Sequence, residues 1–278
     1  MSDKKICQIG NVEFGGGSFS LIAGPCMAES LELCLEVARV MKDLCGELAV
    51  GYVFKASFDK ANRSSVSSYR GPGIEQGLDW LKTVADKLSL PVLTDIHETC
   101  QAARAAQAVD ALQIPAFLAR QTDLLVAAGE TGKAVNIKKG QFMAPWDMAN
   151  CAEKVRSTGN SNILLTDRGT FFGYNRLVSD LRCIPQMQQY APVAFDATHS
   201  IQQPGGLGNA SGGEREFAPI MGSAAIAAGA DALFIETHPN PDNAKSDAGC
   251  QIPLAKMRSV LNRCIAVYNA IKNNPVKL

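Results

Sequence analysis

The chain has 278 residues, of which 46% are hydrophobic and 19% charged, as expected for one large globular domain. Basic and acidic residues both number 27, and this balance provides no long-range attraction to nucleic acid or an anionic membrane. No apolar run reaches the roughly 18 residues of a membrane span, and the start, MSDKKICQIG, lacks the apolar segment of a signal peptide. We therefore predict a cytoplasmic protein with no nucleic-acid or membrane partner, and its nine cysteines, without a CxxC pair, indicate reduced thiols.

Residues 1–18 do not follow the pattern of the rest of the chain. The stretch KICQIG-NVEFGGG alternates between apolar and polar residues, with an asparagine and glycines at its turns, which predicts a short β-hairpin. We expect this hairpin to close the N-terminal mouth of a barrel. The predicted organisation is therefore a hairpin extension over 1–18 and one catalytic domain over 19–278.

Eight short β-type runs follow, separated by amphipathic helical patterns such as 31–44 and 73–88. Most are nearly continuous apolar runs, as expected of parallel strands that are covered on both faces. The sequence thus predicts an α/β fold, a single (β/α)8 TIM barrel. An open doubly wound sheet is the alternative, but no GxGxxG follows the first run. The runs are 20–24, 52–56, 91–95, 111–115, 134–138, 162–166, 192–196 and 232–236.

Polar residues occur at or just beyond the end of each run. In a barrel, the C-terminal ends of the strands meet at one mouth, where the chemistry takes place. A solvated loop charge explains any one of these residues but not the whole set. The glycine-rich segment 200–214 predicts a long loop without regular structure over the same face. The strand-end residues are Cys26, Lys55, Asp95 with His97, Gln113, Lys138, Arg168, Asp196 with His199, and Glu236 with His238.

Cations are concentrated in one part of this set. Several lysines and arginines around one pocket in a chain without net charge indicate an anionic ligand, with phosphate favoured. The two basic groupings suit either two phosphates or a phosphate and a carboxylate. They consist of Lys55, Lys60 and Arg63 in the first grouping, and Lys138, Lys139 and Arg168 in the second.

A second part of the set offers metal ligands. Cys26, His199, Glu236 and Asp247 follow the first, seventh and eighth runs, which become neighbours when a barrel closes. Their mixed sulfur, nitrogen and oxygen donors suit a divalent ion such as Fe2+, Zn2+, Mn2+ or Co2+. Their spacing is no local signature, so a packed thiol, a hydrogen-bonded imidazole and a helix-capping aspartate remain alternatives.

Sequence motifs occur at almost every predicted strand. They are LIAGPCMAES, FKASFDKANRSSVSSYRGPG, PVLTDIHE, LQIPAFLARQTDLL, VNIKKGQFMAPWDM, TDRGTFFGYNRLVSD, VAFDATHSIQQPGG and FIETHPNPDNAKSD. From about residue 20 to the last helix, the chain resembles the 3-deoxy-D-manno-octulosonate 8-phosphate synthase family. The resemblance implies a transferase that condenses phosphoenolpyruvate with D-arabinose 5-phosphate and water. The products are the eight-carbon sugar acid phosphate and phosphate, in lipopolysaccharide biosynthesis.

Two local features distinguish branches of this family and its relatives. The synthases of the seven-carbon heptulosonate phosphate carry a loop resembling KPRTS, whereas this chain has KANRSS, which points to arabinose 5-phosphate rather than erythrose 4-phosphate. In the metal-free branch an asparagine replaces Cys26, so GPC implies the metal-dependent branch. The heptulosonate synthase and a metal-dependent sugar-phosphate aldolase remain the alternative functions.

The resemblance also implies roles for individual residues. Arg63 and Ser64 would bind the aldose phosphate, with Asn62 and Asp95 near its carbon chain and Ser57 as a further substrate-binding residue. Arg120 resembles a residue that reaches into a neighbouring subunit's site, which implies a homotetramer. The phosphoenolpyruvate site would comprise Lys55, Lys60, Gln113, Lys138 and Arg168. The catalytic residues would be Lys55, Asn62, Asp95, Lys138 and His199. The metal ligands would be Cys26, His199, Glu236 and Asp247.

Overall fold

The computed structural model describes residues 5–63, 65–206 and 211–274. Its central feature is a closed barrel of eight parallel strands, in which β11 pairs with both β8 and β14. This confirms the predicted TIM barrel, and each strand starts within one residue of its predicted run. The barrel strands are β3 (Ser20–Gly24), β4 (Gly51–Lys55), β5 (Val92–Asp95), β6 (Ala111–Ile114), β7 (Ala134–Lys138), β8 (Ile163–Asp167), β11 (Val193–Asp196) and β14 (Ala232–His238).

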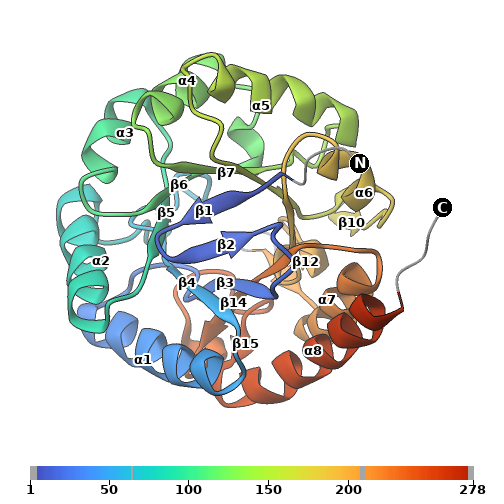
Figure 1. The fold of residues 1–278 in the computed structure, drawn as a ribbon. Helices are drawn as coiled ribbons and strands as arrows, with labels where there is room; N and C mark the ends of the chain where they lie inside the picture. Colours follow the sequence, from blue (N-terminus) through green and yellow to red (C-terminus); the bar gives the residue numbers. More distant parts are fainter. Residues whose placement is uncertain (1–4, 64, 207–210, 275–278) are drawn as a thin grey trace.

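Helices form a ring around the strands (Figure 1). The first of them begins after Ser30, whose hydroxyl accepts a hydrogen bond from Leu33 N at 3.1 Å, a typical N-cap. None of the helices in the described ranges is long and apolar enough to cross a membrane. They are α1 (Leu31–Glu47), α2 (Ile74–Leu88), α3 (Thr99–Ala105), α4 (Thr122–Glu130), α5 (Met148–Arg156), α6 (Cys183–Gln188), α7 (Ala218–Ala227) and α8 (Met257–Asn273).

The N-terminal segment forms the predicted hairpin, with β1 (Cys7–Ile9) antiparallel to β2 (Val12–Phe14). It lies across one mouth of the barrel (Figure 1). Its four apolar side chains pack with the inward-facing residues near the strand starts, in one buried cluster. Gln8 and Asn162 exchange two hydrogen bonds of 2.7 Å, which join the hairpin to the start of β8. The expectation that the hairpin closes the N-terminal mouth is therefore confirmed.

Additional short elements interrupt the simple repeat. The hairpin of β9 (Thr170–Gly173) and β10 (Arg176–Val178) lies between β8 and α6, and β15 (Ile252–Pro253) extends the sheet beside β14. Short 3-10 helices are η1 (Ala116–Leu118), η2 (Pro145–Asp147), η3 (His199–Ile201), η4 (Arg215–Phe217), η5 (Pro241–Asn243) and η6 (Leu254–Lys256).

The segment 200–214 differs in part from its prediction. It contains the end of η3 and two two-residue strands, β12 (Gln202–Gln203) and β13 (Gly212–Gly213), which pair with each other. The expectation of a loop without regular structure was therefore wrong near its two ends, because the backbones of Gln202–Gln203 and Gly212–Gly213 pair with each other. Residues 207–210 lie outside the described residues.

Side chains along each barrel strand alternate between the interior and the helix layer. In β3, Leu21 and Ala23 belong to the large core cluster beneath the helices, whereas Ile22 belongs to the inner cluster. In β4, Phe54 likewise packs under the helices and Val53 packs inside the barrel. This period of two determines which residues beyond the apolar inner cluster face the C-terminal mouth.

Candidate active site

The polar mouth of the barrel follows from the strand alternation. Lys55, Asp95 and Gln113 stand two residues beyond the inward-facing apolar residues Val53, Leu93 and Ala111, so they also face the interior. The barrel interior is thus apolar beneath the hairpin and polar at the other end. The same spacing applies to Asn136 and Lys138 after Ala134, to Thr166 and Arg168 after Leu164, to Asp196 after Ala194, and to Glu236 after Phe234.

A cavity of about 670 Å³ opens at this polar mouth. The segment 200–214 contributes Gln202, Pro204 and Ser211 to its wall, so this segment does lie over the predicted face. Most of the predicted site residues line the cavity, and they come from strand ends and loops far apart in the sequence. They are Lys55, Lys60, Asn62, Arg63, Asp95, Gln113, Lys138, Arg168, His199 and Asp247.

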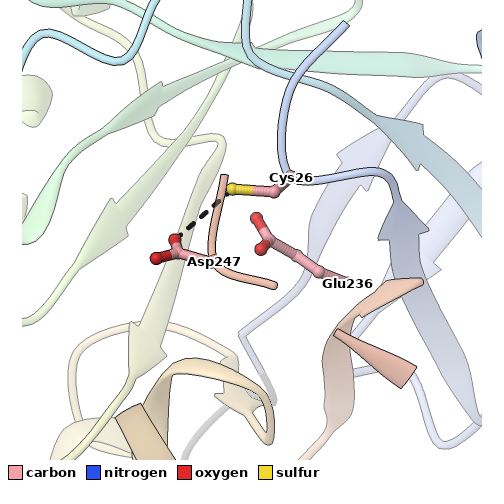
Figure 2. A group of neighbouring side chains, drawn as sticks. All are labelled: Cys26, Glu236 and Asp247. Atoms are coloured by element: carbon pink, nitrogen blue, oxygen red, sulfur yellow. Dashed lines mark hydrogen bonds between the residues drawn. The ribbon is translucent and has the colours of Figure 1, made fainter. Parts of the chain in front are cut away.

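Three of the predicted metal ligands converge at the edge of this cavity. One donor atom each from Cys26, Glu236 and Asp247 lies within 4.8 Å of the other two, and Figure 2 shows the three side chains pointing toward one another. His199 completes the set, because its Nε2 lies 3.5 Å from a carboxylate oxygen of Glu236 and 3.5 Å from one of Asp247. The four predicted ligands therefore share one place in the fold.

The cluster has the properties of a divalent-metal site. Glu236 Oε2 is buried and accepts no hydrogen bond from any described residue, and such an oxygen is costly unless a cation compensates it. Asp247 has a φ of 46°, a left-handed conformation that is uncommon for residues other than glycine and recurs at functional sites. These features fit a bound divalent ion, and the ligand set does not select one metal.

Charge interactions in the cluster shift the pKa values of its members. Burial, together with the neighbouring Glu236 carboxylate, raises the pKa of the Cys26 thiol well above its usual value. Burial alone would lower the pKa of His199, but the Asp196 and Glu236 carboxylates raise it above its usual value. Burial opposes ionisation of Glu236 as well, yet His199 and Lys55 lower its pKa. Without metal, the thiol and the imidazole of the cluster thus keep their protons to a higher pH than usual.

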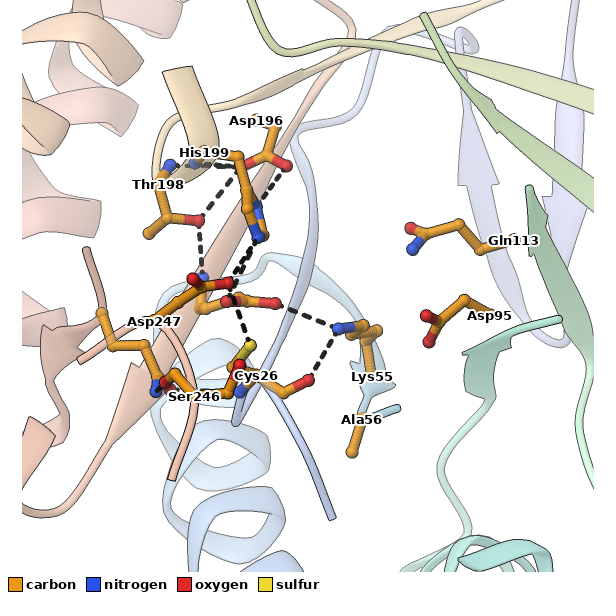
Figure 3. A network of polar contacts seen from close by, with 12 residues as sticks. Cys26, Lys55, Ala56, Asp95, Gln113, Asp196, Thr198, His199, Ser246 and Asp247 are labelled. Carbon is orange, nitrogen blue, oxygen red and sulfur yellow. Dashed lines mark hydrogen bonds and ion pairs between the residues drawn. The ribbon is translucent and has the colours of Figure 1, made fainter. Parts of the chain in front are cut away.

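Asp196 connects the metal ligands to the cationic part of the site. Its Oδ2 accepts a hydrogen bond from His199 Nδ1 at 2.7 Å (Figure 3). The same oxygen accepts from Lys138 Nζ at 2.5 Å. Its Oδ1 accepts from the hydroxyl of Thr198 at 3.0 Å and from His199 N at 2.8 Å. The Nδ1–H of His199 is therefore directed to Asp196, and Nε2 is directed to the candidate metal site, the arrangement typical of metal-binding histidines.

The cationic wall contains groups that are only partly paired. Lys55 Nζ donates to Glu236 Oε1 at 3.0 Å and to Cys26 O at 3.1 Å. Arg168 donates through one terminal nitrogen to Gln202 Oε1 at 2.8 Å, whereas its other terminal nitrogen is buried without a hydrogen-bond partner among the described residues. An unsatisfied buried guanidinium nitrogen at a cavity wall suits an anionic ligand.

The loop after β4 supplies the outer part of the cavity. Arg63 Nε donates to Tyr69 O at 3.0 Å, and one of its terminal nitrogens donates to Ser246 Oγ at 3.0 Å. Asn62 lines the cavity beside it. Ser64 lies outside the described residues. Ser57 is fully buried, and it does not belong to the described lining of the cavity. Its hydroxyl forms no hydrogen bond with any residue that the structure describes.

Asp95 and His97 form a pair at the end of β5. Asp95 Oδ2 lies 3.2 Å from His97 Nε2, and Asp95 Oδ1 is buried without a hydrogen-bond partner in the described part of the chain. The pKa of Asp95 lies well below its usual value, because the His97 hydrogen bond and the Lys55 charge outweigh its burial. Both side chains line the cavity, so Asp95 presents a free carboxylate oxygen to it.

Lys139 does not belong to the cavity, contrary to the sequence-based grouping. It follows the inward-facing Lys138 by one residue, so it points out of the barrel, where it is fully buried. There its Nζ lies 3.4 Å from Asp167 Oδ1 and 3.1 Å from Thr170 Oγ1. The alternation of β7, applied strictly, predicts this outward position.

Several residues that shape the site were missed from the sequence. Gln251 Oε1 accepts from Cys26 N at 3.1 Å, and Gln202 Nε2 donates to Asp247 Oδ1 at 2.9 Å. Gln202 belongs to the two-residue strand β12 and Gln251 to the loop before β15, and such short segments have no periodic pattern that identifies an inward side chain. Asn136 and Thr166, which form a buried row with Gln113, were also missed, although their inward spacing is a signal.

The fold and site together define a barrel enzyme in which a cavity lined by cationic side chains lies beside a cluster of candidate metal ligands. A family model described as "DAHP synthetase I family" matches residues 3–272, and the chain belongs to this family.

Curated relatives cover nearly the whole chain. A protein of Bradyrhizobium diazoefficiens is 54% identical over 97% of this chain and 96% of its own. One of Granulibacter bethesdensis is 57% identical over 93% of each chain. One of Fusobacterium nucleatum is 51% identical over 98% of this chain and 99% of its own. All three are named 2-dehydro-3-deoxyphosphooctonate aldolase.

Proposed function

We propose that this enzyme condenses phosphoenolpyruvate with D-arabinose 5-phosphate and water to give 3-deoxy-D-manno-octulosonate 8-phosphate and phosphate. The observation that carries the proposal is the shared cavity, in which Lys138 and Arg168 lie beside the candidate ligand His199. Relatives more than 50% identical over almost the full length are named 2-dehydro-3-deoxyphosphooctonate aldolase. We assign the reaction to the barrel domain 19–278, with 1–18 as a hairpin extension.

The cationic wall is assigned to phosphoenolpyruvate. Its phosphate and carboxylate are both anions, and the partly unpaired Arg168 and the buried Lys138 suit such groups. Gln113 adds a neutral hydrogen-bonding group at the same wall. The proposed phosphoenolpyruvate site comprises Lys55, Lys60, Gln113, Lys138 and Arg168.

The outer part of the cavity is assigned to the aldose. Arg63 lines it at the loop after β4, which suits a phosphate group, and Ser64 would join it there. Asn62 and Asp95 would contact the carbon chain of the aldose. Ser57 is assigned to substrate binding as well. Two phosphates at opposite sides of one cavity would hold the reacting carbons of the two substrates between them.

The reaction joins carbon 3 of phosphoenolpyruvate to the aldehyde carbon of the aldose. The new C–C bond leaves positive character at carbon 2, and the aldehyde oxygen becomes a hydroxyl by taking up a proton. Water then adds to carbon 2, and the C–O bond to phosphate breaks. Holding both anions in a reactive geometry contributes about 7–11 kcal/mol in well-oriented systems. We assign this positioning to Lys55, Asn62, Asp95 and Lys138.

The metal site is assigned to Cys26, His199, Glu236 and Asp247. A divalent ion held there, Fe2+, Zn2+, Mn2+ or Co2+, would orient the aldose or acidify the attacking water. Glu236 and Lys55 form a buried ion pair of 3.0 Å, so the chain itself connects the ligand cluster to the phosphoenolpyruvate wall.

The metal assignment is tested by removing one ligand. The Cys26→Asn variant should bind Zn2+ or Mn2+ far more weakly, because it loses the thiolate ligand. Metal content after dialysis, measured by atomic emission, reports this directly. A matched control is Cys34→Ser, since Cys34 is a buried thiol in α1 away from the cluster. Unchanged metal content in Cys26→Asn, or full activity in thoroughly chelated wild-type protein, contradicts the assignment.

The reaction itself is tested by phosphate release from phosphoenolpyruvate. We expect release that depends on arabinose 5-phosphate, with erythrose 4-phosphate a much poorer substrate in direct competition. Preference for erythrose 4-phosphate would identify a heptulosonate phosphate synthase. Cleavage of a sugar phosphate without phosphate release would identify a metal-dependent aldolase, and either result overturns the proposal.

We also propose a homotetramer with composite sites. Arg120 is exposed and does not line the described cavity, which fits a side chain that serves a neighbouring subunit's site. Large aromatic side chains are exposed on the loops after β6, β7 and β8, as at many subunit interfaces: Phe117, Phe142, Trp146, Phe172 and Tyr174. The nine free cysteines support a reducing, cytoplasmic location. The product would enter lipopolysaccharide biosynthesis.

A further inference from the structure

Three polar side chains form a row across neighbouring strands at the wall of the cavity. Gln113 on β6, Asn136 on β7 and Thr166 on β8 all face the barrel interior, and Gln113 and Asn136 are direct partners in the strand register. Asn136 and Thr166 are completely buried. Because buried polar groups must pair within the protein, each member of the row constrains its neighbour.

The distances in this row define the direction of its hydrogen bonds. Thr166 Oγ1 lies 2.6 Å from Asn136 Oδ1, a length typical of O–H···O bonds, and donates to it. Asn136 Nδ2 donates to Gln113 Oε1 at 3.1 Å, a length typical of N–H···O bonds. An amide that accepts on one side of this row must donate on the other. A hydroxyl can also accept, but in the reversed row the buried Thr166 O–H would have no acceptor among the described residues, so the threonine favours the direction that engages Gln113 Oε1.

The other end of the Gln113 amide faces the cavity. No described residue accepts a hydrogen bond from Nε2, and Gln113 lines the cavity together with Lys138 and Arg168. Figure 3 shows its side chain beside Asp95, pointing toward Lys55 and the ligand cluster. A reversed amide would direct Oε1 into a cavity built for anions, where its partial negative charge would repel the ligand.

We propose that Asn136 and Thr166 are positioning residues that hold the Gln113 amide with its N–H donor directed at phosphoenolpyruvate. This inference rests on the proposed function and deepens it, because it names groups outside the cavity lining that determine affinity for one substrate. Asn136 and Thr166 act through Gln113 alone.

The test is a double-mutant cycle on phosphoenolpyruvate binding, measured by titration calorimetry without the aldose so that no turnover occurs. Gln113→Met removes the amide at similar size and should weaken binding about 10- to 100-fold, the range of a hydrogen bond to a charged group. Thr166→Val removes only the hydroxyl donor and should weaken binding about 3- to 10-fold, since the Asn136 amide is then free to reverse. In the Gln113→Met background, Thr166→Val should have no further effect.

Controls separate positioning from structural damage. Thr166→Ser keeps the hydroxyl and should bind as the wild type does. Thr94→Val removes another completely buried strand threonine, which donates to Ala56 O at 2.8 Å, and should leave binding unchanged. In steady state, Thr166→Val should raise KM for phosphoenolpyruvate while kcat and KM for arabinose 5-phosphate stay constant. If Thr166→Val fails to fold, Asn136→Asp replaces it, because a carboxylate accepts the Gln113 N–H and turns Oε1 to the ligand.

The outcomes distinguish the two proposals. In the first case, wild-type protein binds phosphoenolpyruvate and releases phosphate, but Thr166→Val has the same effect in both backgrounds or no effect in either. This result overturns the positioning inference alone. Wild-type protein without phosphoenolpyruvate binding overturns the proposed function and this inference together. Loss of affinity in Thr166→Val that is absent in the Gln113→Met background supports it.

Discussion

At the scale of single residues, one carboxylate joins the two chemical parts of the site. Asp196 is completely buried and accepts hydrogen bonds from both Lys138 and His199. Its pKa stays well below the usual value, because the charges of His199 and Lys138 outweigh its burial. Asp196 thus remains ionised, and it holds the imidazole with Nε2 toward the candidate metal site.

Replacing this carboxylate tests its effect on the metal. Asp196→Asn keeps the shape but loses the negative charge, and we expect metal affinity to fall about 10- to 100-fold. Titration of the metal-free protein with Co2+ or Zn2+ against a competing chelator measures it. Ser200→Ala is a matched control, since Ser200 is a buried residue of η3 that donates to Ala197 O at 3.2 Å. Wild-type affinity in Asp196→Asn contradicts this role.

Metal binding should also release protons. The pKa values of Cys26 and His199 are raised in the metal-free protein, so each group keeps its proton to a higher pH than usual, and a bound metal must displace that proton. Affinity should therefore fall as pH decreases, by up to about tenfold per pH unit for each proton released. Calorimetry in buffers of different ionisation enthalpy counts the protons, and Cys26→Asn should release one fewer. Affinity that is independent of pH between 6 and 8 is the contrary result.

At the scale of elements, the N-terminal hairpin and the strand ends have separate tasks. The hairpin buries Cys7, Ile9, Val12 and Phe14 against the apolar half of the barrel interior. The polar half of the same strands forms the cavity. Stability and chemistry are thus divided between opposite mouths, as in other barrels of this kind.

Truncating the hairpin core should reduce stability without altering the site. Phe14 is completely buried, and Phe14→Ala should cost about 3–5 kcal/mol of unfolding free energy, because it leaves a cavity in the closed mouth. Urea denaturation followed by circular dichroism measures it, and KM values of the folded enzyme should be unchanged. Ile6 directly precedes β1 and is 48% exposed. Ile6→Ala should therefore change the free energy of unfolding by no more than about 0.5 kcal/mol. Equal effects of the two changes would disprove this role of the hairpin.

At the scale of the whole molecule, the proposed homotetramer determines whether a site is complete. Arg120 is exposed, and Lys154 Nζ donates to its backbone oxygen at 2.9 Å, which anchors the backbone and leaves the guanidinium outside the cavity of its own chain. Lys138 lies inside the cavity. If each site combines Lys138 of one subunit with Arg120 of another, two inactive chains can complement each other.

Mixed oligomers test this arrangement. Co-expression of differently tagged Lys138→Ala and Arg120→Ala chains, followed by tandem purification, should yield more activity than either parent, because some sites receive both residues intact. Light scattering should report a tetramer for the wild type. The control is the Arg104→Ala variant, in which the exchanged arginine pairs with Glu75 of its own chain. This variant should be active by itself, without a second chain to complement it. Hybrids no more active than the parents, or a monomeric wild type, contradict composite sites.

Much of the molecule was determined by the sequence alone. The eight apolar runs and the helical patterns between them predict the barrel, because the periods of two and 3.6 residues are local properties of strand and helix. The strand-end position of Lys55, Asp95, Gln113 and Lys138 follows from the same periods, since parallel strands direct their ends to one mouth.

Other features were decided only by the tertiary structure. Lys138 and Lys139 are adjacent and chemically identical, yet one faces the cavity and the other forms a buried pair with Asp167 outside the barrel. Gln251 contacts Cys26 across 225 positions of sequence, and loop residues carry no periodic signal for such a contact. Pairing, orientation and charge in the site depend on distances between segments remote in sequence, and only barrel closure brings those segments together.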